Sequence, residues 1–342
     1  MTNILVIYTG GTIGMKQHHE TGVWQPFNFE QIIEEVPVLK KFGFTIDTLS
    51  FDPLIDSSEV QPSFWVKLAQ LISGNYTKYD GFVVLHGTDT MSYTASALSF
   101  MLENLEKPII LTGSQLPIGM LRTDGMENLV SAIEIAAAKE NGRPCVPEVC
   151  IFFENQLFRG NRTTKDNAEQ FKAFRSANYP ALAHAGVYIK FNTPVIQHPT
   201  QWGKPLKINT HLDNNVAVLK IFPGVSQKII ESILNTNNLR AVILETYGSG
   251  NAPTTPWFIH SLKRAIDSGL ILVNITQCAA GSVEMDKYET GMALKKVGVL
   301  SGYDSTTEAA LTKLFLLLGQ QKDNHVVKNL WQKNISGEIS LI

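Results

Sequence analysis

Short apolar runs alternate along this chain with longer stretches in which apolar residues recur every three or four positions. The apolar runs fall at residues 4–8, 81–86, 108–112, 149–153, 216–221, 241–246 and 270–275. Runs of this length are typical of buried strands, whereas the spacing from Phe64 to Ile72 and from Met126 to Ile133 is typical of helices. The alternation predicts an α/β fold with a mainly parallel sheet flanked by helices.

The alternation stops over residues 190–213, which contain three prolines and little periodicity. Such a stretch is typical of a linker. We therefore expect a larger N-terminal domain over 1–189 and a smaller C-terminal α/β domain over 214–342. The length of 342 residues agrees with two domains, because single cores stop growing well below that size.

The composition and net charge indicate which classes of binding partner are unfavourable for this protein. With 44% hydrophobic and 18% charged residues the chain resembles ordinary globular proteins. A net charge of -2 disfavours nucleic acids and anionic membranes, which attract basic surfaces. No apolar run approaches the roughly 18 residues that span a bilayer, and no signal-peptide pattern follows Met1, so we expect a cytoplasmic protein. Three cysteines are too few for a disulfide framework.

A glycine-rich turn, T-G-G-T-I-G at Thr9–Gly14, follows the first apolar run. Such turns often bind phosphate groups, but these glycines do not have the G-x-G-x-x-G spacing, and the chain contains no Gly-Lys-Ser or Gly-Lys-Thr step. Residues 15–22 are polar and end in glycine, which we interpret as a lid over a site. The pattern therefore disfavours a nucleotide site.

Gly-Thr steps follow two separate strands, at Thr12 and at Thr88. The carboxyl ends of parallel strands meet at one edge of a sheet, where ligands bind. A threonine hydroxyl needs a base or a cation to become a nucleophile, and Asp89 and Lys165 are the candidates. Taken singly, Thr12 is more often a hydroxyl that satisfies turn amides, and Lys165 a solvated lysine. The repeated Gly-Thr step favours the nucleophilic site.

Other chemistries lack their motifs. The stretch Tyr247–Asn251 does not have the G-x-S-x-G spacing of a hydrolase elbow. His18 and His19 are adjacent, so they cannot share one helix face, and no H-E-x-x-H pattern accompanies them. We therefore interpret these two histidines as solvated loop residues.

Several of these segments together resemble one known family. T-G-G-T-I-G at Thr9–Gly14 and L-H-G-T-D-T-M at Leu85–Met91 are similar to the two signature motifs of bacterial-type L-asparaginases. Further similar segments are T-A-S-A-L-S-F-M at 94–101, T-G-S-Q at 112–115, R-G-N-R-T-T-K at 159–165, Y-G-S-G-N-A-P at 247–253 and N-I-T-Q-C at 274–278. The resemblance covers nearly the whole chain and is strongest to the cytoplasmic type I branch.

The resemblance implies a reaction and its residues. Thr12 would attack the side-chain amide of L-asparagine, forming a β-aspartyl intermediate and releasing ammonia. Thr88, Asp89 and Lys165 would form the second catalytic group, and Asp89 would also hold the α-ammonium of the substrate. Backbone N–H groups at Gly11 and Thr88 would stabilise the oxyanion, each contributing about 3 kcal/mol in the transition state.

The same resemblance implies how the substrate is held. Asp56, Ser57 and Ser58 match a loop that grips the α-amino and α-carboxylate groups. Asn251 matches a position that reaches the site from a neighbouring subunit, which implies a homodimer, alone or paired into a homotetramer. No metal, cofactor, nucleic acid or membrane partner is implied.

Two positions depart from the family pattern. Relatives carry a lid tyrosine that assists the first threonine, but here Trp24 stands near that place. Some type I relatives bind asparagine at a regulatory site, which Thr276 and Cys278 match. Glu245 stands where an arginine would bind the effector carboxylate, and like charges repel. We therefore predict little or no activation by asparagine.

Three other functions stay open at this stage. They are a glutaminase-asparaginase of broader specificity, an ammonia-supplying subunit of a tRNA amidotransferase, and a non-catalytic amino-acid sensor. One methylene in a small pocket is worth only about 1–3 kcal/mol, so the sequence does not fix the choice between asparagine and glutamine. The set of Thr12, Thr88, Asp89 and Lys165 favours an enzyme over a sensor.

Overall fold

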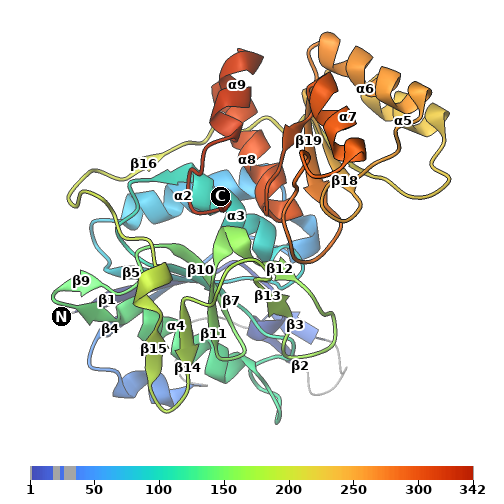
Figure 1. The fold of residues 1–342 in the computed structure, drawn as a ribbon. Helices are drawn as coiled ribbons and strands as arrows, with labels where there is room; N and C mark the ends of the chain where they lie inside the picture. Colours follow the sequence, from blue (N-terminus) through green and yellow to red (C-terminus); the bar gives the residue numbers. More distant parts are fainter. Residues whose placement is uncertain (1, 18–23, 27–35, 342) are drawn as a thin grey trace. The chain divides into compact units, whose positions relative to one another are not determined.

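The computed structural model describes residues 2–17, 24–26 and 36–341, which form two compact units. Unit 1 comprises Met1–Asn209 and unit 2 comprises Thr210–Ile342 (Figure 1). Residues 190–213, which we predict as a linker, contain the end of β15, the turn η6 and the short strand β16. The domain limits expected from the sequence stay a prediction.

Unit 1 is built on an eight-stranded sheet in the order β15-β14-β11-β10-β7-β5-β1-β4. The strands are β1 (Asn3–Tyr8), β4 (Thr45–Ser50), β5 (Gly81–Leu85), β7 (Ile109–Thr112), β10 (Val149–Phe153), β11 (Gln156–Arg159), β14 (Ala183–Ala185) and β15 (Ile189–Phe191). Strands β4, β1, β5, β7 and β10 are parallel, and the remaining three extend the sheet antiparallel. The predicted α/β fold with a mainly parallel sheet is confirmed.

Helices cover both faces of this sheet. They are α2 (Pro62–Asn75), α3 (Met91–Met101) and α4 (Gly125–Ala137). Figure 1 shows α2 and α3 on one face and α4 on the other. Strands β5 and β10 are therefore buried along their whole length, as expected for central parallel strands.

Short elements connect the main ones in unit 1. They are η1 (Thr12–Gly14), β2 (Met15–Gln17), β3 (Trp24–Pro26), η3 (Pro37–Lys41), η4 (Ser57–Glu59), β6 (Leu102–Glu103), β8 (Lys139–Glu140), β9 (Arg143–Pro144), η5 (Gly160–Arg162), β12 (Thr164–Lys165), β13 (Phe174–Arg175), η6 (Thr193–Val195) and β16 (Lys207–Ile208). Within the described residues no helix is both long and apolar enough to cross a bilayer.

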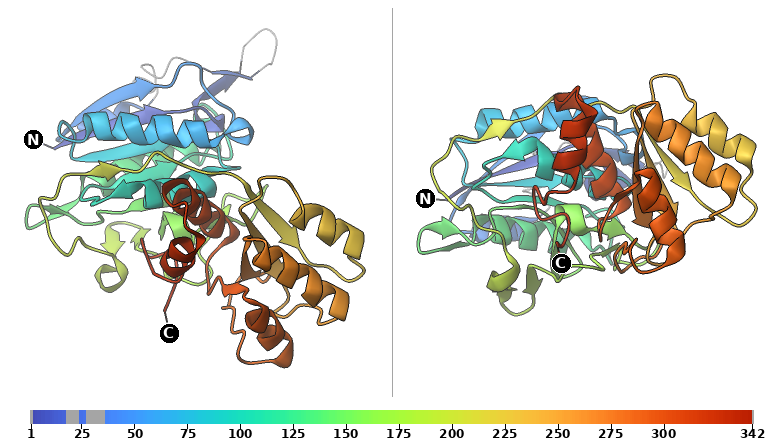
Figure 2. Two further views of the ribbon diagram at one scale, coloured as in Figure 1. Left: turned by 90° about the horizontal axis from the view of Figure 1, so that it is seen from above. Right: turned by 45° about the horizontal axis from the view of Figure 1, so that its top comes forward.

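Unit 2 has a four-stranded parallel sheet in the order β17-β18-β19-β20. Its elements are β17 (Val216–Lys220), α5 (Gln227–Leu234), β18 (Ala241–Thr246), α6 (Pro256–Asp267), β19 (Ile271–Thr276), α7 (Glu289–Val297), β20 (Leu300–Ser301), α8 (Thr307–Gln320) and α9 (Asn324–Trp331). Figure 2 shows α5, α6 and α7 along one face of these strands and α8 and α9 along the other.

Alternate residues of β18 supply the two cores of unit 2. Val242 and Leu244 belong to the cluster under α5, α6 and α7, while Ala241 and Ile243 belong to the cluster under α8 and α9. This alternation is the two-residue period of a strand that is covered on both faces. The expected smaller C-terminal α/β part is confirmed.

Candidate active site

Four adjacent parallel strands bring the candidate residues to one edge of the sheet in unit 1. Strand β1 lies between β4 and β5, and β7 follows β5. Thr12 follows β1, Asp56 follows β4, Thr88 follows β5 and Gln115 follows β7. After β1 the chain forms β4 on one side of β1, and it then crosses over to form β5 on the other side. Such a switch point is where open α/β sheets bind ligands.

Two glycines let the turn after β1 pass against its neighbours. Gly10 and Gly11 have φ angles of +131° and +91°, a region that side chains rarely adopt. A Cβ atom on Gly11 would lie 2.6 Å from the Cα of Gly87, and one on Gly10 would meet the carbonyl of Ile55. The turn that begins η1 at Thr12 therefore packs directly against the Gly87-Thr88 step.

Thr88, Asp89 and Lys165 form a bonded group. The Lys165 Nζ donates to Thr88 Oγ1 at 2.8 Å and to Asp89 Oδ1 at 2.6 Å. The Lys165 side chain is 19% exposed, whereas that of Asp89 is 64% exposed. Lys165 lies in the short strand β12, which pairs with β13. The structure thus joins three of the predicted residues across 77 positions of sequence.

Gln115 connects Thr88 to a second loop. Its Oε1 accepts a hydrogen bond from Thr88 Oγ1 at 3.4 Å, and its Nε2 donates to the carbonyls of Ala168 and Gln170, each at 3.1 Å. The carboxylate of Asp124 accepts from the Gln115 N–H and so fixes the turn. The T-G-S-Q segment after a strand pointed to Gln115, but no sequence signal pointed to Asp124.

Asp56 places a negative charge at the same edge. Its Oδ1 accepts from the Ser58 N–H at 2.9 Å and from Ser58 Oγ at 2.8 Å. These two bonds lower the pKa of the Asp56 carboxyl below its usual value. Ser57 is buried, and its carbonyl accepts from Thr90 Oγ1 at 2.6 Å. An ionised carboxylate on a fixed turn can bind an ammonium group.

His86 lies beneath the Gly87-Thr88 step. Its Nδ1 is 2.7 Å from the carbonyl of Gly87, which only accepts, so Nδ1 carries the proton. The Nε2 then accepts from Thr94 Oγ1 at 3.0 Å, and that hydroxyl accepts from the Trp65 indole. Burial lowers the pKa of His86 to about 4. No feature of the sequence predicts that His86 is buried beneath this step.

Other predicted residues are not joined to this group. Asn251 lies in unit 2, where its Oδ1 accepts from Thr290 Oγ1 at 2.7 Å. The backbone of Trp24 in β3 pairs with Gln17 in β2. The rest of the predicted lid, residues 18–23, lies outside the described residues. Among the residues that the structure describes, no three His, Cys, Asp or Glu side chains are arranged to hold a metal ion.

Comparison with known proteins identifies the family. Residues 3–197 match the family model described as "Asparaginase, N-terminal", and residues 215–331 match "Glutaminase/Asparaginase C-terminal domain". The chain belongs to the asparaginase family. This asparaginase chain is also 43% identical to L-asparaginase 1 of Escherichia coli strain K12, across 99% of its own length and 98% of that relative.

Two further comparisons extend this similarity to a solved structure and to a mammalian protein. The crystal structure of L-asparaginase I from Vibrio cholerae superposes with a TM-score of 0.90 at 43% identity, covering 99% of each chain. The 60 kDa lysophospholipase of Mus musculus is 42% identical over 99% of this chain but only 62% of its own length. The similarity therefore extends through both units of the fold.

Proposed function

We propose that this protein hydrolyses L-asparagine to L-aspartate and ammonia, with Thr12 as the nucleophile. The observation that carries the proposal is the group of Thr88, Asp89 and Lys165 at the sheet edge where the Thr12 turn packs. Family membership and the relatives named L-asparaginase support the substrate. The expected place of the reaction is the cytoplasm.

In the first half of the reaction, the Oγ of Thr12 forms a bond to the side-chain carbonyl carbon of asparagine. The C–N bond then breaks, and the Thr12 proton leaves with the ammonia. Backbone N–H groups at Gly11 and Thr88 face the oxyanion, and such donors contribute about 3 kcal/mol each. The product of this half is an ester between Thr12 and the β-carboxyl group.

In the second half, water attacks this ester and restores the Thr12 hydroxyl. Lys165 holds the Thr88 hydroxyl in one orientation, and Thr88 orients the water. Asp56 and Asp89 place two carboxylates beside the substrate ammonium, and the loop of Ser57 and Ser58 grips the substrate carboxylate. Asn251 supplies a polar group from a second copy of the chain, so the active form is a homo-oligomer.

Ammonia release from L-asparagine and L-glutamine tests the proposal. We expect Thr12→Ala to abolish release, and Lys165→Met to lower kcat about 100-fold or more, because the Thr88 hydroxyl loses the group that orients it. Thr236→Ala is the matched control, because this exposed hydroxyl caps a carbonyl at the end of α5. Full activity in Thr12→Ala would reject the nucleophile, and no release from either amide by the unmodified protein would favour a sensor.

A further inference from the structure

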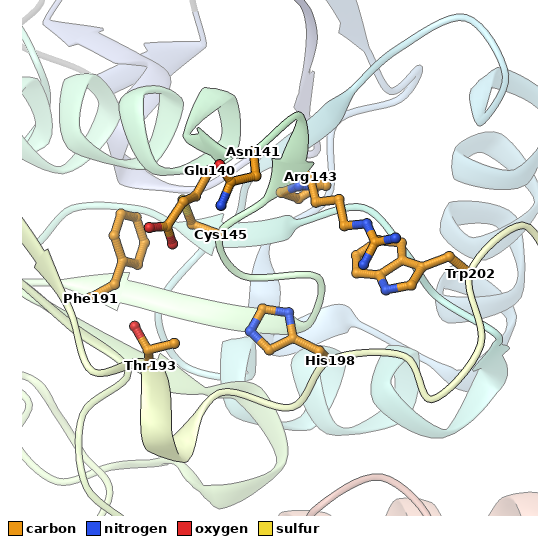
Figure 3. Close-up of a pocket in the computed structure, with 9 residues that line it drawn as sticks. Glu140, Asn141, Arg143, Cys145, Phe191, Thr193, His198 and Trp202 are labelled. Carbon is orange, nitrogen blue, oxygen red and sulfur yellow. The ribbon is translucent and has the colours of Figure 1, made fainter.

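A cavity of about 400 Å³ lies in unit 1, apart from the edge that carries the threonines. Its lining includes Glu140, Arg143, Phe191, Thr193, His198 and Trp202. Small-molecule sites measure about 300–1,000 Å³, so this cavity has the size of one. Figure 3 shows the polar and aromatic side chains arranged around it. The hairpin β8–β9, after α4, forms one wall, and the segment after β15 forms the other.

The Glu140 carboxylate and the Arg143 guanidinium, which have opposite charges, lie on different sides of this cavity (Figure 3). They are direct partners in the antiparallel pair β8–β9, a position where opposite charges attract. Glu103 and Lys207 have the same relation in β6–β16 and form an ion pair of 2.9 Å. Among the ion pairs of the described residues, Glu140 and Arg143 form none. In Figure 3 their charged ends lie on different sides of the cavity.

The stacking of Arg143 on Trp202 explains the separation. The guanidinium carbon lies 4.9 Å from the centroid of the indole ring. This cation–π contact draws Arg143 away from Glu140 and fixes the plane of the guanidinium. The N–H edge of a fixed guanidinium is the geometry that binds a carboxylate with two hydrogen bonds.

A buried ion pair holds the opposite wall in place. The Arg159 guanidinium bonds to the Glu148 carboxylate at 2.6 Å, and both side chains are less than 10% exposed. Glu148 also accepts from the Gln197 N–H at 2.6 Å, and Arg159 donates to the Val195 carbonyl at 2.9 Å. The segment 193–198 is thereby anchored before any ligand arrives. A preformed wall lowers the entropy cost of binding.

We propose that this cavity binds an amino acid with an aromatic side chain as its zwitterion, with the ammonium at Glu140 and the carboxylate at Arg143. Thr193 and His198 offer further hydrogen-bonding groups, and Phe191 offers an aromatic surface for an apolar side chain. A ligand with a single charge satisfies only one end of the cavity. This site shares no residue with the threonine site.

Calorimetric titration of the full-length protein with three matched probes tests the charge requirement. The probes are L-phenylalanine, phenethylamine, which lacks the carboxylate, and 3-phenylpropionate, which lacks the ammonium. We expect L-phenylalanine to bind and each single-charge analogue to bind about tenfold more weakly, the effect of one lost charge-assisted hydrogen bond. Equal binding of 3-phenylpropionate would make this a plain anion site, and absence of L-phenylalanine binding at millimolar concentration would also overturn the proposal.

Four variants locate the binding. Glu140→Gln and Arg143→Gln should each weaken L-phenylalanine binding about tenfold or more, while Glu103→Gln, the matched control, should not. Asp56→Ala removes a carboxylate from the threonine site and should leave this binding unchanged. Ammonia release from L-asparagine should be unaffected in Glu140→Gln and Arg143→Gln, so this test does not depend on the proposed function. Unchanged L-phenylalanine affinity in Glu140→Gln would reject the site.

Discussion

At the scale of single residues, His86 shows how burial decides the charge of a group beside the candidate site. Its ring is 1% exposed and bonds to Gly87 through Nδ1 and to Thr94 through Nε2. Both bonds are made by the neutral ring. Burial lowers its pKa to about 4, so the histidine stays uncharged beneath the Gly87-Thr88 step at neutral pH.

A pH-dependent contribution to stability follows from His86. In the unfolded chain a histidine binds a proton near pH 6.5, whereas the folded protein resists this until about pH 4. The stabilisation is therefore complete above pH 6.5 and is lost as the pH falls toward 4. Between pH 7 and pH 5 the stability advantage of the unmodified protein over His86→Asn should shrink by about 2 kcal/mol, measured by urea unfolding.

The control for this prediction is Thr236→Ala, because Thr236 carries an exposed hydroxyl that does not titrate in this pH range. Its stability difference from the unmodified protein should not change with pH. A His86→Asn difference that is equally large at pH 5 and pH 7 would mean that folding does not lower the pKa of His86.

Single residues were predictable to different degrees. The Gly-Thr steps at Thr12 and Thr88 are visible because they follow apolar runs. On spacing alone Lys165 was more typical of a solvated lysine, since it lies 77 positions after Thr88 in a two-residue strand without its own sequence signal. The family resemblance selected it, and the structure brings its Nζ to the Thr88 hydroxyl. The bond from Asp124 to the Gln115 N–H depends on turn geometry, which composition does not show.

At the scale of elements, burial explains which strands the sequence predicts. All seven apolar runs correspond to strands. Six of these strands are central, parallel and covered on both faces, whereas β17 lies at the edge of its sheet and only its Leu219 is buried. Strand β4, T-I-D-T-L-S, was missed: it lies at the sheet edge, and none of its residues is fully buried. Strands β14 and β15 have only three residues each, too short for a periodic signal.

The turn after β1 is the element on which the candidate site depends most. In Gly11→Ala the added Cβ would lie 2.6 Å from the Cα and N atoms of Gly87, and the residue would also keep a φ of +91°. Backbone strain of this kind costs about 1–3 kcal/mol. We expect lower thermal stability and a large loss of ammonia release, because Thr12 and Thr88 can no longer approach each other.

Gly74→Ala is the matched control for that change. Gly74 lies in α2, and an added Cβ would meet nothing within 4 Å. Alanine stabilises a helix relative to glycine by about 0.5–1 kcal/mol, so this variant should be slightly more stable and fully active. Normal activity in Gly11→Ala would show that the close approach of the two turns is not required.

At the scale of the whole molecule, the surroundings of Glu245 bear on regulation by asparagine. Its Oε1 accepts from Thr307 Oγ1 at 2.8 Å, and its Oε2 lies 4.0 Å from Lys220 Nζ. Thr276, which matches the regulatory site of some relatives, donates to the carbonyl of Gly248 at 2.6 Å. If the resemblance to those relatives extends to regulation, an effector carboxylate would meet the fixed carboxylate of Glu245.

We expect the rate of ammonia release to rise hyperbolically with L-asparagine concentration. The physical reason is the repulsion between the Glu245 carboxylate and that of an asparagine effector. Initial rates of the unmodified protein, measured over a wide range of L-asparagine concentration, test this prediction. A steep sigmoidal curve would contradict the prediction.

A buried ion pair in unit 2 gives a further prediction on stability. Lys313 donates to Glu338 and to the carbonyls of Trp331 and Lys333, and both charged side chains are 1% exposed. Burial lowers the pKa of Lys313, and the charge of Glu338 opposes this shift. Glu338→Gln should lower the stability by about 3–5 kcal/mol, because it leaves a buried charge without its partner.

Thermal unfolding measures this loss, with Glu284→Gln as the control, since Glu284 forms an exposed pair with Lys287 at 3.6 Å. That control should change stability by less than about 1 kcal/mol. An unchanged melting temperature in Glu338→Gln would show that Lys313 is compensated by the two carbonyls alone.

The place of Glu338 also sets an order of events during synthesis. A chain emerging from the ribosome exposes the whole of unit 1 long before Glu338 is added, and units generally fold in that order. Lys313 precedes its partner by 25 residues, so the core around α8 and α9 stays incomplete until nearly all of unit 2 has emerged. A nascent chain halted shortly before Glu338 would thus carry a folded unit 1 beside an unfinished unit 2, a ready substrate for chaperones and proteases.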